Sequence, residues 1–182
     1  VRVNAPTTAD FALDLAALTR TRVRRVMVAK AEDAASLAPL DGFEVIALCE
    51  TARGVVAAET LAALPHVVAL MWGAEDLVAG MGGTSSRTDG GGYRDVARLA
   101  RARVLLAAAA FGAAAIDAVH VDIDDVDGLA AEAQDAAASG FTATACIHPG
   151  QVATIRAAYA PTPAQLAWAE AVLAAAAGER GV

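Results

Sequence analysis

Two acidic residues, Glu50 and Asp76, stand at or just past the ends of apolar runs that have the length of β-strands. A charged carboxylate is costly at the end of a buried strand unless it is paired or binds a metal. If the two strands are neighbours, the carboxylates can share one cation, and Mg²⁺ is usually held by two carboxylates, substrate oxygens and water. Two alternatives stay open. A nearby arginine could neutralise each acid, and Glu75 competes with Asp76 as the ligand.

Other residues near strand ends have types that suit an anionic substrate. Gly73 and Ala74 are small, so backbone N–H groups can approach an anion there, although a tight turn from strand to helix also needs glycine. The guanidinium of Arg2, in the first apolar strand, could bind a carboxylate through two hydrogen bonds or pair with a neighbouring acid. Lys30 is the only lysine. It could form a Schiff base, make an electrostatic contact or lie on the surface.

The remaining polar clusters favour structural interpretations. His148 precedes Pro149, which restricts it to an extended conformation, and we favour a hydrogen-bonding role over that of a general base. Four acids within residues 122–127 lack the glycine and final glutamate of an EF-hand loop, so they predict a solvated helix start. Arg94, Arg98 and Arg101 have helical spacing and predict a solvated helix face. The loop at residues 80–92, rich in Gly, Ser and Thr, is either a ligand-contacting lid or a flexible surface loop.

The elements that must position these residues alternate between strand and helix. Continuous apolar runs, typical of parallel strands covered on both faces, predict six strands. These are Val1–Asn4, Arg25–Ala29, Glu44–Glu50, Val67–Trp72, Ala115–Ile123 and Ala143–Ile147. Helices are predicted at Thr8–Leu18, Glu32–Leu37, Val55–Ala63, Tyr93–Phe111, Val126–Ala138, Gln151–Tyr159 and Pro163–Ala177. This alternation indicates βαβ units and a parallel sheet.

The sheet could be an open doubly wound one or a (β/α)₈ (TIM) barrel. Polar residues follow several strands, and in a barrel the carboxyl ends of all strands converge on one mouth. The first strand is not followed by the glycine pattern of a dinucleotide-binding fold. We therefore predict a TIM barrel and treat residues 1–182 as one partial barrel domain. Since a closed barrel needs eight strands, we expect two βα units to precede Val1.

Composition excludes several classes of protein. The chain has 182 residues, a net charge of −7 and 57% hydrophobic residues, which is ample for one domain with a core. The acidic balance argues against nucleic-acid binding, and no apolar run is long enough to predict a membrane span. Cys49 and Cys146 lie in separate apolar runs, so we expect two buried free thiols in the cytoplasm, a reducing compartment.

Six ordered segments of the chain resemble the citrate lyase β-subunit-like branch of the HpcH/HpaI aldolase superfamily. These segments are Val1–Asn4, Val26–Glu32, Ala47–Gly54, Trp72–Leu77, Ile116–Val119 and Ile147–Gln151. The Glu-Thr-Ala block at Glu50 and the Gly-Ala-Glu-Asp-Leu block at Gly73 are the most specific. The resemblance extends over nearly the whole chain.

The resemblance implies a TIM barrel that binds a divalent metal, normally Mg²⁺, through Glu50 and Asp76. Arg2 would hold the oxygens of a 2-oxo acid, and backbone N–H groups of residues 73–76 would bind its carboxylate. The implied reaction cleaves a 3-hydroxyacyl-CoA of the citryl-, malyl- or citramalyl-CoA type. The metal acts as a Lewis acid, and Arg2 stabilises charge on oxygen. Relatives of this kind are commonly homotrimers.

Some features of the chain depart from the family pattern. Val28-Ala29-Lys30 stands where relatives usually have Leu-Pro-Lys. The first two strands of the family, and the C-terminal tail that can cover a neighbouring site, are not in the sequence. Two alternatives to the lyase therefore stay open: a non-catalytic subunit with the same fold, and a class II pyruvate aldolase that releases an aldehyde. Arg87, in the loop at residues 80–92, is a candidate contact for coenzyme A.

Overall fold

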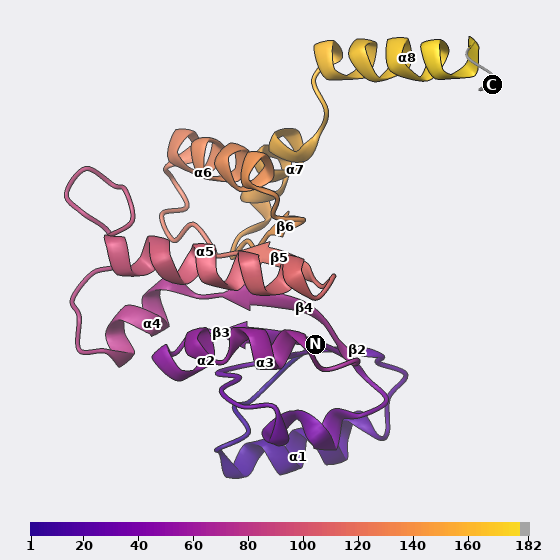
Figure 1. Ribbon diagram of the computed structural model, residues 1–182. Coiled ribbons are helices and arrows are strands. Elements are labelled where there is room, and N and C mark those ends of the chain that lie inside the picture. Colours follow the sequence, from indigo (N-terminus) through magenta and orange to yellow (C-terminus); the bar gives the residue numbers. More distant parts are fainter. Residues whose placement is uncertain (179–182) are drawn as a thin grey trace.

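The computed structural model describes residues 1–178 and contains a six-stranded parallel sheet with the strands in sequence order (Figure 1). The strands are β1 (Arg2–Val3), β2 (Arg25–Val28), β3 (Glu44–Cys49), β4 (Val67–Trp72), β5 (Ala114–Asp117) and β6 (Ala143–Thr144). Each strand pairs with the next in parallel register. Because all strands run the same way, their carboxyl ends share one edge of the sheet, as the alternation of strands and helices predicted.

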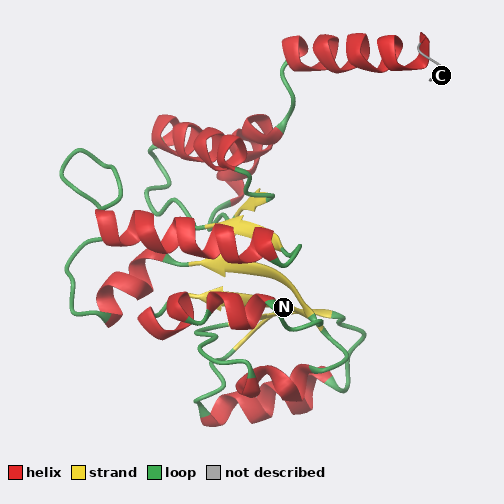
Figure 2. Cartoon of the chain, in the orientation of Figure 1, coloured by secondary structure: helices red, strands yellow, loops and turns green. Residues whose placement is uncertain are grey.

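The helices that connect the strands pack along the sheet (Figure 2). These helices are α1 (Ala9–Leu18), α2 (Ala52–Val56), α3 (Ala58–Ala62), α4 (Ala74–Gly80), α5 (Asp95–Ala110) and α6 (Val126–Ser139), and the helices α7 (Val152–Tyr159) and α8 (Pro163–Gly178) follow the last strand. Two 3₁₀ turns, η1 (Ala35–Leu40) and η2 (Pro149–Gln151), complete the elements. None of the helices in the described part of the chain is long and apolar enough to cross a membrane.

The hydrophobic core lies between the sheet and the helices. Val26, Val28, Val45 and Ala47 are fully buried and belong to one cluster with residues of the neighbouring helices. These side chains alternate along β2 and β3, so they share the helix-covered face of the sheet. Small alanines of α5 complete the packing. This core packs against β3 and β4, and the predicted site residues Glu50 and Gly73 directly follow these two strands.

Several boundaries differ from the predicted ones. Helix α4 was not among the predicted helices. β5 ends at Asp117 rather than Ile123, and the Asp117 carboxylate accepts hydrogen bonds from the N–H of Ala118 and from the ring N–H of Trp72. The expectation of two buried thiols is half wrong: both cysteines are free and Cys49 is buried, but Cys146 is exposed.

The C-terminal helix α8 projects away from the rest of the molecule (Figure 1). Its large apolar side chains are exposed: Trp168 exposes 70% of its surface and Leu173 exposes 69%. An exposed apolar helix of this kind is a typical contact surface for another chain.

Candidate functional site

Glu50 lies directly after β3 and is nearly buried, with 7% of its surface exposed. Its Oε1 accepts a hydrogen bond from the backbone N–H of Lys30, at 3.1 Å. Burial raises the pKa of Glu50, and the charge of Asp76 raises it further. The Lys30 N–H and the charges of Lys30 and Arg2 oppose these effects without cancelling them. A cation beside Glu50 would relieve both the burial and the repulsion between the carboxylates.

Asp76 reaches the same place from the next strand along the sheet. It lies in the first turn of α4, which follows β4, and its side chain is about half exposed rather than buried as a strand-end position suggested. Its Oδ1 lies 3.4 Å from Nζ of Lys30. Lys30 therefore contacts both acids, one through its backbone and one through its side chain. The structure thus places Glu50 and Asp76 around one lysine, and their role as joint ligands of a cation stays a prediction.

Lys30 owes this double contact to its backbone conformation. It is the only non-glycine residue with a positive φ, 49°, among the described residues. This left-handed conformation is uncommon for side-chain-bearing residues and concentrates at functional sites. The Lys30 side chain is half exposed and paired with Asp76, which fits the electrostatic contact better than a Schiff-base lysine in an apolar pocket.

The ion pair at the two carboxylates is formed by a lysine and not by an arginine. Among the described residues, neither Glu50 nor Asp76 forms an ion pair with an arginine. Arg2 is exposed and acts on Glu50 only through its charge. The alternative of two acids each neutralised by arginine is therefore wrong, and Arg2 keeps its guanidinium free of a carboxylate partner within the described chain.

Gly73 lets the junction between β4 and α4, the helix that carries Asp76, approach Glu50. A Cβ atom at Gly73 would lie 2.9 Å from Cβ of Glu50, closer than real Cβ atoms come, and a tight 3.3 Å from its Oε2. Gly73 is also the N-cap residue of α4. The close approach, rather than the turn alone, therefore explains why this position is glycine.

The described residues contain no group of three His, Cys, Asp or Glu side chains arranged to hold a metal. The pair Glu50 and Asp76 thus supplies two carboxylates and leaves the other coordination positions to outside ligands. This is the arrangement in which Mg²⁺ is commonly held by proteins, with water and substrate oxygens completing the shell. The donor set and the raised pKa of Glu50 both fit a hard divalent cation.

Glu75, the competing ligand, is held elsewhere. Its Oε1 accepts a hydrogen bond from Oγ of Ser86, at 2.6 Å, and Ser86 is 1% exposed. His148 has a local structural role, because its Nδ1 accepts the N–H of Gly150 and caps η2. Asp125 caps α6 by accepting the N–H of Gly128, so the acidic segment is a helix start as predicted.

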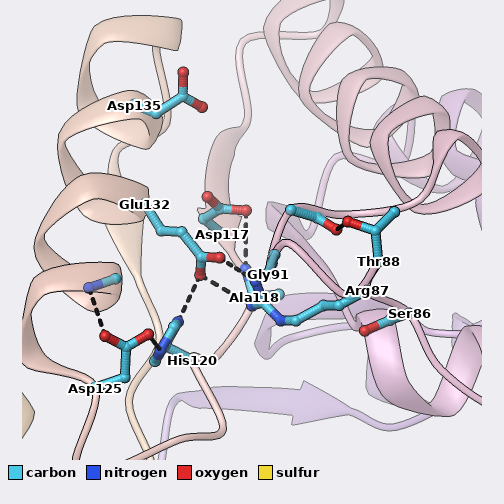
Figure 3. A network of polar contacts seen from close by, with 12 residues as sticks. Ser86, Arg87, Thr88, Gly91, Asp117, Ala118, His120, Asp125, Glu132 and Asp135 are labelled. Atoms are coloured by element: carbon cyan, nitrogen blue, oxygen red, sulfur yellow. Dashed lines mark hydrogen bonds and ion pairs between the residues drawn. The ribbon is translucent and has the colours of Figure 1, made fainter.

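A network of charged residues beside the site was missed at the sequence level (Figure 3). Arg87 forms a bidentate ion pair with Glu132 of α6, and Nδ1 of His120 lies 2.8 Å from the same carboxylate. The Arg87 guanidinium also stacks on the ring of Tyr93, at 4.1 Å. Arg87 is thus engaged within the protein, which weighs against its predicted contact with coenzyme A.

A second cluster of charged residues joins Arg101 of α5 to Asp117, the last residue of β5, and to Asp135 of α6. Arg101 binds Asp117 with both its Nε and Nη2 atoms and also contacts Asp135. Its side chain is only 18% exposed, so the expectation of a solvated face at this position of α5 is wrong. The sequence carried one signal for it: Asp117 is a charged residue inside an apolar strand-like run and therefore needs a partner.

Comparison with known proteins gives consistent matches. The family model described as HpcH/HpaI aldolase/citrate lyase matches residues 1–149. A citrate lyase subunit beta-like protein of Mycobacterium tuberculosis is 57% identical over 181 residues, which are 100% of this chain and 66% of that protein. The mitochondrial citramalyl-CoA lyase of Mus musculus is 39% identical over 142 residues, which are 73% of this chain and 40% of that protein.

Solved structures agree with the sequence matches. The crystal structure of CitE from Mycobacterium tuberculosis with magnesium, acetoacetate and coenzyme A superposes with a TM-score of 0.91 and 57% identity, covering 100% of this chain and 68% of that one. A citrate lyase beta subunit from the same organism, complexed with oxaloacetate and magnesium, gives a TM-score of 0.87 and 57% identity, covering 88% of this chain and 72% of that one. The chain thus spans about two thirds of the length of the Mycobacterium tuberculosis relatives and 40% of the mouse protein.

Proposed function

Because the chain belongs to the HpcH/HpaI aldolase/citrate lyase family, we propose that it is a magnesium-dependent carbon–carbon lyase. Its substrate is a 3-hydroxyacyl-CoA of the citryl-, malyl- or citramalyl-CoA type, and its products are a 2-oxo acid and acetyl-CoA. The observation that carries the proposal is the pairing of buried Glu50 with Asp76 around Lys30. The ligands named for the relatives, magnesium, oxaloacetate, acetoacetate and coenzyme A, support it.

Glu50 and Asp76 would hold the magnesium ion. When bound, the ion supplies Lewis-acid polarisation of the substrate hydroxyl or carbonyl oxygen. Burial of Glu50 fixes one carboxylate against the sheet, while the half-exposed Asp76 closes the pair from α4. Lys30 balances part of their negative charge and keeps both in place when substrate enters.

The other residues would bind the substrate. Arg2, the first residue of β1, stabilises negative charge that develops on oxygen, and its free guanidinium suits a 2-oxo acid. The backbone N–H groups of Gly73, Ala74, Glu75 and Asp76 receive the carboxylate. Cleavage turns the hydroxyl into the oxo group with loss of its proton, and the electron pair of the broken bond stays on acetyl-CoA, which takes up a proton.

We further propose that the six strands form part of a (β/α)₈ barrel within a single domain, and that the enzyme works as a homotrimer in the cytoplasm. Parallel strands in unbroken sequence order support the barrel, because a doubly wound sheet reverses its strand order at a switch point. The exposed apolar side chains of α8 support association between copies. Light scattering coupled to size-exclusion chromatography measures the number of copies directly.

The experiment that tests the proposed function is a cleavage assay of (S)-citramalyl-, malyl- and citryl-CoA with and without Mg²⁺. We expect activity that EDTA abolishes and Mg²⁺ restores, and loss of that activity in Glu50→Gln and Asp76→Asn with the fold retained. Glu44→Gln is the matched control, because Glu44 begins the same strand but lies at its opposite, exposed end. Full activity after EDTA treatment would refute the proposal, and aldehyde release without CoA dependence would favour the aldolase.

A further inference from the structure

Helix α4 carries two acids side by side, yet only one of them faces Glu50. Consecutive residues of a helix point about 100° apart, so Glu75 and Asp76 leave the first turn in different directions. Glu75 has the longer and more mobile side chain and lies within the segment proposed to receive the substrate carboxylate. The Glu75 carboxylate therefore needs a partner that keeps it away from the Glu50–Asp76 pair.

Ser86 makes this distinction. Its hydroxyl donates a 2.6 Å hydrogen bond to Oε1 of Glu75, and the serine itself is 1% exposed. Ser86 lies 11 residues after Glu75, in the loop that sequence composition marked as either a lid or a flexible segment. A buried hydroxyl with a charged partner is a strong hydrogen-bond donor, because solvent does not compete for it.

The loop around Ser86 is anchored on both sides. The Ser86 carbonyl oxygen accepts the N–H of Arg94, at 2.8 Å, just before α5. The next residue, Arg87, binds Glu132 of α6 and the carbonyl of Gly91 (Figure 3). Its guanidinium also stacks on the ring of Tyr93. Ser86 therefore holds Glu75 from a fixed position rather than moving with it.

Glu132, which holds Arg87 in place, is stabilised in its charged form. Burial works against the charge of Glu132, but the hydrogen bonds from Arg87 and His120 and their charges together lower the pKa of Glu132 below its ordinary value. Glu132 thus stays ionised and keeps Arg87 in place. The negative charge of Glu75 is also among the charges that raise the pKa of Arg87.

We propose that Ser86 is a positioning residue that holds Glu75 away from the Glu50–Asp76 pair, so that the metal meets two protein carboxylates and not three. This inference rests on the proposed function. With two carboxylates, an octahedral cation keeps positions open for the oxygens of a 2-oxo acid. A third carboxylate would occupy one of those positions and would repel the negative substrate.

The test is Mn²⁺ binding, followed by electron paramagnetic resonance, and pyruvate binding to the Mn²⁺-loaded protein. Ser86→Ala frees Glu75. We expect Mn²⁺ to bind about tenfold more tightly, because ligand charge sets affinity, and pyruvate to bind about tenfold more weakly because one position is taken. Opposite changes mark a positioning role, since general loosening of the loop would weaken both.

Two further variants separate this role from a structural one. Glu75→Gln in the Ser86→Ala background removes the competing charge and should restore both affinities to within about twofold, within the usual error of additive substitutions. Ser85→Ala, which removes the neighbouring exposed hydroxyl that contacts only the Arg87 backbone, should change neither. Circular dichroism confirms that each variant is folded.

The outcomes are distinct. If the unmodified protein binds no Mn²⁺, the proposed function fails. If it binds Mn²⁺ but Ser86→Ala weakens both ligands together, or changes neither, or Glu75→Gln does not reverse its effect, then Ser86 does not act through Glu75 and only this inference is overturned.

Discussion

Replacing Glu132 by glutamine tests the network that fixes the loop beside the site. Glu132 is 28% exposed, and it holds Arg87, which is 18% exposed, and His120, which is 6% exposed. Its contacts include Arg87 Nη2 to Oε2 at 3.1 Å and His120 Nδ1 to Oε2 at 2.8 Å. Glu132→Gln keeps the volume but leaves two largely buried cationic or polar partners without their carboxylate.

The magnitude follows from burial. Breaking a buried pair costs about 3–5 kcal/mol. The partial exposure of Glu132 and the amide oxygen that glutamine retains reduce this to about 2–3 kcal/mol. For a chain of this size, that loss lowers the melting temperature by roughly 4–12 °C. The matched control is Glu44→Gln, which removes an exposed 2.6 Å pair with Arg25. Exposed pairs contribute at most about 1 kcal/mol, so this control should shift melting little.

The pH dependence has a defined sign. Because the pKa of Glu132 is lowered in the folded protein, its contribution is present above the ordinary carboxylate pKa and is lost as pH falls through the lowered value. Urea unfolding, followed by circular dichroism from neutral to acidic pH, should show the gap between the unmodified protein and Glu132→Gln narrow as pH falls. A variant that loses no more stability than Glu44→Gln, or a gap that widens in acid, would refute this account.

Two other substitutions test the site itself. Gly73→Ala places a methyl group 2.9 Å from Cβ of Glu50; we expect isothermal titration to show about tenfold weaker Mg²⁺ binding, because the Glu50 carboxylate must move. The control is Gly80→Ala, which should leave Mg²⁺ binding unchanged because a Cβ atom there meets nothing within 4 Å. Unchanged Mg²⁺ affinity in Gly73→Ala would contradict the close packing. In the metal-free protein at neutral pH, Glu50→Gln removes a buried charge that burial and Asp76 disfavour, so its melting temperature should rise; a fall would show that Glu50 is stabilised by its surroundings.

The strands were predictable because each is a continuous apolar run. β4 has the predicted bounds, Val67–Trp72, and β3 differs by one residue at its end. Buried parallel strands need apolar side chains on both faces, and the sequence shows this without knowledge of the fold. The meeting of Glu50 and Asp76 was predictable for the same reason, since neighbouring parallel strands deliver their next residues to one edge.

The missed features depend on contacts between distant residues. Helix α4 has only seven residues, too few for its periodicity to stand out. The partner of Asp117, Arg101, is 16 residues away, and the partner of Arg87, Glu132, is 45 away. Nothing in the spacing reveals such pairs. The hydrogen bond from Ser86 to Glu75 was likewise not predictable, because Ser86 lies 11 residues later in a separate loop.

The central claim is that Glu50 and Asp76 bind one magnesium ion together. A crystal structure of the protein with Mg²⁺ and pyruvate tests it most directly. We predict one ion with an oxygen of Glu50 and an oxygen of Asp76 each at about 2.0–2.1 Å, and oxygens of pyruvate in the same shell. An ion bound elsewhere, or bound by only one of these carboxylates, would contradict the claim.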